Sequence, residues 1–184
     1  MAQAKQLLAE AGYPNGEGFP AFEVLYNTVE HHRKIALTIQ QMWKNNLGID
    51  ATLTNQEWKV YLNTRKERQY TVARAGSVGS FADPVDFLDS YTTESGMNDT
   101  GWSNKTFDEL VNRAAQIEDQ EQRFSWFQEA EKILTDEVPL IPIYYYTKVK
   151  LKAANVKGWH ENLLDHPDFK GVYIETDTKS PANN

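Results

Sequence analysis

The residues with the most obvious chemical potential are four histidines, at positions 31, 32, 160 and 166. No two of them have the i, i+4 spacing of a zinc-protease helix, and the sequence contains no cysteine to complete a thiolate site. The glycine-rich phosphate loops and the GxSxG elbow of serine hydrolases are also missing from the sequence. These observations predict no metal site, no cofactor and no catalytic residue.

A run of carboxylates at Asp83, Asp86 and Asp89 is the second feature that could do chemistry. Paired carboxylates serve as acid and base when they lie a few ångströms apart, which a sequence does not reveal. Asp83 precedes Pro84, an arrangement typical of a helix start, where acidic side chains favour the positive end of the helix dipole. A hydrolase that uses Asp83, Asp86 or His160 remains an alternative.

Composition limits the possible partners. The chain of 184 residues is 40% hydrophobic and carries a net charge of −7. An acidic surface repels phosphate backbones, so we expect no nucleic-acid partner. No apolar run approaches the roughly 18 to 20 residues needed to cross a bilayer, and residues 1–12 resemble an amphipathic helix, not a signal peptide. We expect any export signal or lipid anchor to lie outside this sequence.

The first half of the chain alternates between strand and helix patterns. The helices are expected at residues 4–11, 31–46 and 57–68, and the strands at 22–26, 49–54 and 70–75. Gly48 is placed to end the second helix. Because parallel strands need crossover connections, this order predicts an α/β unit with helices on a mixed or parallel sheet.

The second half begins with an irregular stretch, residues 76–102, which contains one expected helical turn at 84–88. Two helices should follow, with inward apolar residues at Phe107, Leu110, Val111 and Ala114 in the first and at Phe124, Phe127 and Leu134 in the second. Asp119 should cap the second helix. Beyond it we expect an edge strand at 140–146, because Pro142 cannot donate to a ladder.

The C-terminal residues lack a core of their own. A short strand is expected at 172–175, and residues 180–184 should be a frayed tail. We therefore expect residues 1–152 to form the α/β unit and residues 153–184 to form a segment that packs on a part of the protein outside this sequence.

Several short segments of the sequence resemble those of the oligopeptide-binding proteins of ABC transporters, which form family 5 of the extracytoplasmic solute-binding proteins. They are LYNT (25–28), WKNNLGI (43–49), NQEWKVYLNTR (55–65), VARAG (72–76), DPVDFLD (83–89), TGWSNKTFDELV (100–111) and VPLIPIYYY (138–146). These segments occur in the same order as in the family and are spread over nearly the whole chain. Members of the family are more than twice as long, so the resemblance implies the second lobe of a two-lobed, type II periplasmic-binding-protein-like fold.

The resemblance also implies a ligand site. Positions that match His32, Arg65 and Arg74 neutralise the carboxylate end of bound peptides in the family, and positions that match 77–80 meet the ligand's backbone and amino end. Arginine offers carboxylate a rigid, two-pronged donor. We take Ser77, Val78, Gly79, Ser80 and Phe81 as the candidate loop, and add Trp159 as a residue near the site mouth or the lobe junction.

One position departs from the family pattern. Family members usually carry an acidic residue in this loop, just before the DP element, and its carboxylate anchors the ammonium group of the peptide. This chain reads Gly79-Ser80-Phe81 instead. The departure leaves blocked peptides and other polar solutes as alternatives to peptides with a free amino end.

The expected function is that of a non-catalytic lobe that captures peptides or similar small polar solutes by hinge closure. The implied partners are the missing first lobe of the same protein and the membrane subunits of an ABC importer. We expect a monomer in the periplasm or at the extracellular face of the cell membrane. A sensor or chaperone module that contacts protein surfaces is a further alternative.

Overall fold

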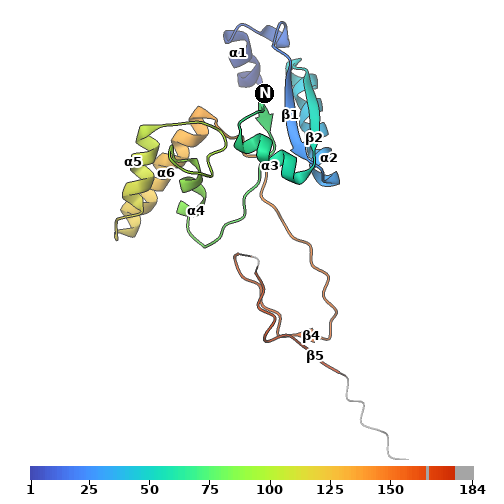
Figure 1. Ribbon diagram of the computed structural model, residues 1–184, viewed down its shortest axis with the longest axis vertical. Helices are drawn as coiled ribbons and strands as arrows, with labels where there is room; N and C mark the ends of the chain where they lie inside the picture. The colour runs from blue at the N-terminus through green and yellow to red at the C-terminus, as the bar shows by residue number, and fades with distance from the viewer. Residues whose placement is uncertain (165, 177–184) are drawn as a thin grey trace, which may run out of the picture. The chain divides into compact units, whose positions relative to one another are not determined.

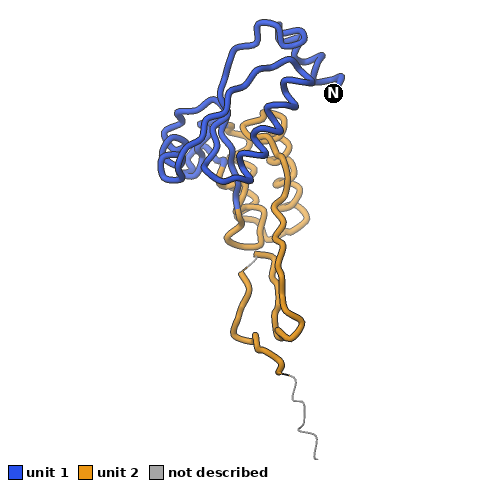
Figure 2. The backbone as a smooth tube through the Cα atoms, turned by 90° about the vertical axis from the view of Figure 1, so that its right-hand side faces the viewer, with its two compact units in different colours: residues 1–77, 91–103 blue, residues 78–90, 104–184 orange. Residues whose placement is uncertain are grey.

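The computed structural model describes residues 1–164 and 166–176. The chain forms two compact units, shown in separate colours in Figure 2. Unit 1 comprises Met1–Ser77 and Tyr91–Ser103, and unit 2 comprises Val78–Ser90 and the chain from Asn104 onward. The division expected from the sequence, at residue 152, concerns packing on a part of the protein outside this chain and stays a prediction.

Unit 1 is built on a three-stranded parallel sheet. Its strands are β1 (Phe22–Asn27), β2 (Ala51–Gln56) and β3 (Val72–Ala73), in the order β2-β1-β3. Register runs from Phe22 opposite Ala51 to Asn27 opposite Gln56. Four successive residues of β1, from Val24 to Asn27, are buried, as expected of a central parallel strand that is covered on both faces. The prediction of an α/β fold is confirmed, with all three strands of this sheet parallel.

The helices of unit 1 are α1 (Ala2–Glu10), α2 (Glu30–Leu47) and α3 (Trp58–Lys66), with a single 3-10 turn, η1 (Pro14–Gly16), after α1. Helix α2 lies against β1 and β2 (Figure 1). The centroids of the Trp43 and Phe22 rings are 5.6 Å apart at this contact. The helix ends at Gly48 as predicted, with φ 73°. A Cβ atom at Gly48 would lie 2.0 Å from the Asn15 carbonyl oxygen, so only glycine fits this approach.

Residues 91–103 return to unit 1 as an irregular loop that is organised by one buried side chain, Asn98. The Nδ2 atom of Asn98 donates to the carbonyls of Tyr91, Thr92 and Trp102, and its Oδ1 atom accepts from the Thr100 amide. The side chain of Asn98 therefore provides hydrogen-bond partners for backbone carbonyl and amide groups of the loop, which has no strand hydrogen bonds of its own.

Unit 2 contains a packed pair of helices, α5 (Lys105–Ala114) and α6 (Gln120–Glu137), preceded by the short α4 (Val85–Leu88) and the turn η2 (Asp89–Tyr91). All four residues predicted to face inward from α5 are buried. In α6 the prediction holds for Phe127 and Leu134 but is wrong for Phe124, which is 46% exposed. Asp119 caps α6 as predicted, accepting from the amides of Glu121 and Gln122.

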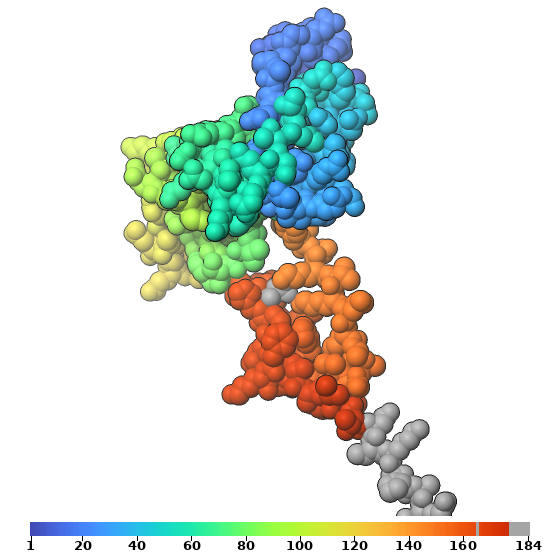
Figure 3. Space-filling view, turned by 45° about the vertical axis from the view of Figure 1, so that its right-hand side comes forward, coloured from blue at the N-terminus to red at the C-terminus, as the bar shows by residue number. Residues whose placement is uncertain are grey.

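The strand expected at residues 140–146 does not form, which corrects that prediction. The stretch is extended and exposed, with Tyr145 96% accessible, and the space-filling view shows it in orange as a narrow run of side chains (Figure 3). Its β-forming residues have no neighbouring strand in the described part of the chain, and a strand without a partner gains no ladder hydrogen bonds.

Beyond residue 152, β4 (Val156–Lys157) pairs antiparallel with β5 (Tyr173–Ile174), which lies within the strand predicted at 172–175. The expected frayed tail at 180–184 falls outside the described residues. Among the residues that the structure describes, no helix is long and apolar enough to cross a membrane.

Candidate ligand-binding site

Two predicted site residues of unit 1, His32 and Arg74, lie at the carboxyl ends of the parallel strands. His32 lies in the first turn of α2, which follows β1, and Arg74 directly follows β3, with its amide donating to the Leu25 carbonyl at 2.7 Å. In open α/β sheets ligands bind beyond the carboxyl ends of the strands. The fold therefore places both side chains where such a site is expected.

His32 and Arg74 influence each other electrostatically. Partial burial lowers the pKa of His32 below its ordinary value, and the positive charge of Arg74 lowers it further. A hydrogen bond to the backbone of Asn27 acts in the opposite direction on the same pKa. At neutral pH this edge of the sheet consequently presents an uncharged imidazole beside a charged guanidinium.

Arg65, the third predicted carboxylate-binding residue, already has an anionic partner. Its guanidinium forms an ion pair with Asp99 at 2.9 Å and lies over the ring of Tyr61, 5.7 Å from the centroid. The Tyr61 hydroxyl, in turn, donates to the Arg74 carbonyl. Arg65 and Arg74 therefore both contact the buried Tyr61. The charge of Arg65 is compensated by Asp99.

Two polar residues at this edge were missed by the sequence reasoning. Asn27 and Gln56 are the last residues of β1 and β2 and stand opposite each other in the register. The Oδ1 atom of Asn27 and the Oε1 atom of Gln56 are buried and have no hydrogen-bond donor in the described part of the chain. In native proteins such atoms are normally satisfied by water or by a ligand. Their position at strand ends was the available signal.

The candidate loop, residues 77–81, has no regular secondary structure. Ser77, Val78, Ser80 and Phe81 are exposed, and Gly79 is half-buried. The Ser80 amide donates to Oδ2 of Asp86 at 2.5 Å, and the Asp83 amide donates to the Phe81 carbonyl at 3.0 Å. The end of the loop is therefore tied to the start of α4.

Arg123 holds the start of α4 from the α6 side. Its two terminal nitrogens meet the two carboxylate oxygens of Asp83 at 2.8 Å each, and its Nε donates to the Ala114 carbonyl at 3.0 Å. The hydrogen bond from Arg123 lowers the pKa of the Asp83 carboxyl below its ordinary value. Asp83 also accepts from the Val85 amide, which confirms the predicted helix start. Arg123 was missed by the sequence reasoning, because it lies 40 positions away from Asp83 along the chain.

The remaining candidate, Trp159, lies in unit 2 near β4. Its ring packs edge-on against Phe169, with centroids 5.1 Å apart, and the Lys150 ammonium lies over it at 5.8 Å from the centroid. Lys150 is also ion-paired with Glu161 at 3.3 Å. Trp159, Lys150 and Glu161 line a hollow together with residues 151–153 and Val156.

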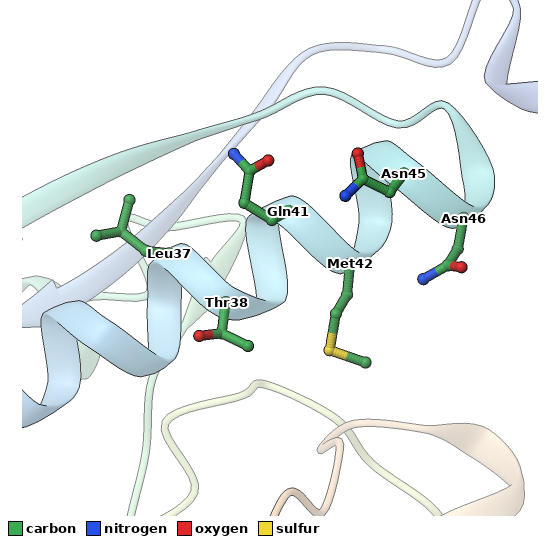
Figure 4. A pocket seen from close by; sticks show the side chains of 6 residues that line it. All are labelled: Leu37, Thr38, Gln41, Met42, Asn45 and Asn46. Carbon is green, nitrogen blue, oxygen red and sulfur yellow. The ribbon is translucent and has the colours of Figure 1, made fainter.

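A second, more open hollow lies along one face of α2 (Figure 4). It is lined by Leu37, Thr38, Gln41, Met42, Asn45 and Asn46. None of these residues belongs to the predicted site, and none carries a charge. In the described ranges, 1–164 and 166–176, no three histidine, cysteine or acidic side chains group in a way that could hold a metal ion.

Comparison with known proteins identifies the class. The structure of the Escherichia coli murein tripeptide binding protein MppA matches with a TM-score of 0.85 at 37% identity, over 95% of this chain and 34% of that one. Haemophilus influenzae OppA in complex with RPPGFSPFR matches with a TM-score of 0.83 at 33% identity, with the same coverage. The fold is that of one lobe of a type II periplasmic binding protein, as predicted.

The family model for bacterial extracellular solute-binding proteins, family 5 (middle) matches residues 1–99, and the chain belongs to this family. The dipeptide-binding protein DppE of Bacillus subtilis is 39% identical over 171 residues, which are 92% of this chain and 31% of DppE. The chain thus spans about a third of the length of the relatives it matches. The resemblance seen in the sequence is confirmed.

Proposed function

We propose that this chain is one lobe of a receptor that captures a peptide, or a similar small polar solute, and delivers it unchanged to the membrane subunits of an ABC importer. The observation that carries the proposal is that His32 and Arg74 lie at the same carboxyl edge of the sheet, near enough for the charge of Arg74 to lower the pKa of His32. The chain that carries them is a member of the solute-binding family. A guanidinium beside a neutral imidazole suits a carboxylate, since both groups donate hydrogen bonds and one carries a full charge. DppE is named for binding dipeptides, and the OppA structure contains the peptide RPPGFSPFR.

In this proposal the candidate residues bind different parts of the ligand. Arg74 and His32 take the carboxylate end of the ligand, and a carboxylate that reached Arg65 would compete with Asp99 for the guanidinium. The irregular and largely exposed segment 77–81 would offer backbone groups to the ligand backbone, which would make binding tolerant of side-chain identity. We assign Trp159 to the rim of the site.

The complete protein would close on its ligand by a hinge movement, with the rest of the site supplied by the part of its relatives that this chain does not span. A ligand that contacts both lobes shifts the population toward the closed form. We propose that the complete protein acts as a monomer in the periplasm or at the outer face of the membrane, where the importer's membrane subunits receive the solute.

The geometry of Asp83 argues against this residue as the general acid in the hydrolase alternative. A general acid must hold a proton near the working pH, whereas Arg123 keeps the carboxyl group of Asp83 ionised by lowering its pKa.

Thermal-shift measurements distinguish the proposed solute receptor from the sensor or chaperone alternative. A solute receptor gains stability with ligand concentration according to RT ln(1 + [L]/Kd), and a scaffold does not.

The experiment that tests the proposal is calorimetric titration of the complete protein with di-, tri- and tetrapeptides. Arg74→Gln should weaken binding by about tenfold or more, since a charge-assisted hydrogen bond contributes about 1.5–3 kcal/mol. Arg33→Gln, which removes the charge of an exposed arginine in the first turns of α2, is the matched control. Peptides with an amidated carboxyl end should respond little to Arg74→Gln. If amidated and free peptides lose affinity equally, Arg74 does not bind the carboxylate.

A further inference from the structure

The ion pair between Arg65 and Asp99 changes what Arg65 can bind. One terminal nitrogen of the Arg65 guanidinium lies 2.9 Å from Oδ2 of Asp99, and the two side chains are only 20% and 22% exposed. The opposite charges therefore cancel at short range, in a place where water and salt screen them little. A guanidinium carries five N–H donors, so Arg65 still has donors for a ligand although its charge is compensated.

Asp99 is fixed by its loop as well as by Arg65. The Tyr70 hydroxyl donates to the Asp99 carbonyl at 2.9 Å, and the Arg68 guanidinium donates to the Asn98 carbonyl at 3.1 Å. The Asn98 side chain is buried and organises the loop through its own hydrogen bonds. These contacts hold the loop backbone beside α3, so a ligand that reached Arg65 would still have the Asp99 carboxylate close by.

The surroundings of the pair strengthen its effect on charged ligands. Burial raises the pKa of the Tyr70 hydroxyl and of the Tyr91 hydroxyl, and the charges of Arg65 and Asp99 act on both pKa values. The pair therefore lies among partly buried phenol groups that are neutral at physiological pH. Because charges interact more strongly where little water separates them, repulsion of a second anion by Asp99 is effective there.

The ion pair is close to the residue assigned to the carboxylate end of the ligand. The Arg65 guanidinium lies over the Tyr61 ring, and the hydroxyl of the same tyrosine donates to the Arg74 carbonyl. A peptide whose carboxylate end lay on Arg74 would have its last side chain within reach of Arg65. An uncharged polar side chain would accept from the Arg65 donors, whereas a carboxylate there would also meet the negative charge of Asp99.

We propose that Asp99 is a specificity-determining residue that excludes a second carboxylate from Arg65, so that this chain prefers peptides with an uncharged last residue over peptides with an acidic one. This inference rests on the proposed peptide-binding function and specifies its ligand class. In the simpler alternative, Asp99 only anchors its loop to α3. The alternatives differ in one respect, which is whether the negative charge of Asp99 affects the choice of ligand.

The test uses Asp99→Asn in the complete protein, because an asparagine Oδ1 still accepts a hydrogen bond from Arg65 while the charge is lost. Di-, tri- and tetrapeptides of alanine that end in Gln or in Glu are titrated by calorimetry, since the two last residues have similar shapes and differ by one charge. The unsubstituted protein should bind the peptide that ends in Gln about tenfold or more tighter than its Glu counterpart. Asp99→Asn should reduce this ratio to about threefold or less.

Two further variants serve as controls. Asp99→Glu keeps the charge and should keep the preference for Gln. Asp50→Asn removes an exposed carboxylate at the opposite, amino edge of the same sheet, where Asp50 precedes β2, and should leave the ratio unchanged.

Equal affinity of the unsubstituted protein for the two peptides, a result that needs no variant, would overturn the assignment of Asp99 while the peptide receptor stands. A ratio that Asp99→Asn leaves unchanged would do the same. If neither the Gln nor the Glu series binds, the peptide assignment is overturned together with that of Asp99.

Discussion

Arg123 and Asp83 form a two-pronged ion pair, with both nitrogen–oxygen contacts at 2.8 Å. The pair joins α6 to the segment that carries the candidate loop, and both side chains are largely shielded from water. Arg123 also lies over the ring of Phe127, 4.8 Å from the centroid, which fixes its orientation. The loop is thus positioned by a residue that lies outside the predicted site.

Arg123→Gln should lower the free energy of unfolding by about 2 kcal/mol, because the Asp83 carboxylate loses charge-assisted hydrogen bonds. Arg123→Lys should recover only part of this loss, since an ammonium does not make the parallel pair of contacts. Chemical denaturation of the chain measures both. Hydrogen exchange of the amides at 80–88 should rise in Arg123→Gln, and unchanged exchange there would show that the ion pair does not hold the loop.

The same pair predicts an acid dependence. Because the folded pKa of Asp83 is lowered, its contribution to stability is present above the unfolded pKa of about 3.9 and is lost as pH falls through the folded value. Asp83→Asn should therefore flatten the loss of stability below about pH 4. Asp136→Asn, an exposed carboxylate of α6, is the control. Equal acid curves for Asp83→Asn and the unsubstituted chain would contradict the pairing.

His32 predicts a dependence of the same sign in a higher pH range. Its folded pKa is lowered, so below the unfolded value of about 6.5 the unfolded chain binds a proton that the folded chain does not. Stability should fall as pH drops from about 6.5 toward the folded pKa, and His32→Gln should reduce this fall. His160→Gln changes an exposed histidine of unit 2 and should keep the original slope. An unaltered slope in His32→Gln would contradict the lowered pKa of His32.

Gly48→Ala tests the end of α2. The residue has φ 73°, and its added Cβ atom would lie 2.0 Å from the Asn15 carbonyl oxygen. The left-handed conformation alone costs an alanine about 1–2 kcal/mol, and the clash adds to this. Gly96→Ala, where a Cβ atom would meet nothing within 4 Å, is the matched control. Thermal melting that shifts equally in the two variants would contradict the close approach.

The elements that the sequence predicted well are those with local signals. Helix α2 follows from a 3.6-residue apolar period and a glycine stop, and α5 from a period whose four inward residues are all buried. The failures depend on distant residues. The stretch at 140–146 has strand-forming residues but no neighbouring strand among the described residues, and a single sequence cannot show which strand pairs with which.

The site shows the same division between local and distant information. The resemblance directed attention to His32 and Arg74, and the structure brings them into electrostatic contact. It did not reveal that Asp99 compensates Arg65, or that Asp86 reaches the backbone of Ser80. Both relationships arise from side chains on irregular loops, whose path is set by contacts such as those of Asn98 and Arg123 and not by a periodic pattern.

Residues 1–184 alone should bind peptides more weakly than the micromolar range. Half of a bridging site offers fewer contacts, while the translational and rotational cost of association is unchanged. Calorimetry of the isolated chain with the peptides that bind the complete protein should show little heat. Micromolar or tighter binding by the chain alone would show that this lobe contains the whole site.

Native mass spectrometry of the gently purified complete protein tests the central claim most directly. The account predicts one molecule of a short peptide, or of a similar small polar solute, bound to each protein monomer and released intact after denaturation. Prolonged incubation with added peptide should leave the peptide mass unchanged. A protein that carries no small solute and gains none from a peptide mixture, or one that converts the peptide to fragments, would contradict the assignment as a solute receptor.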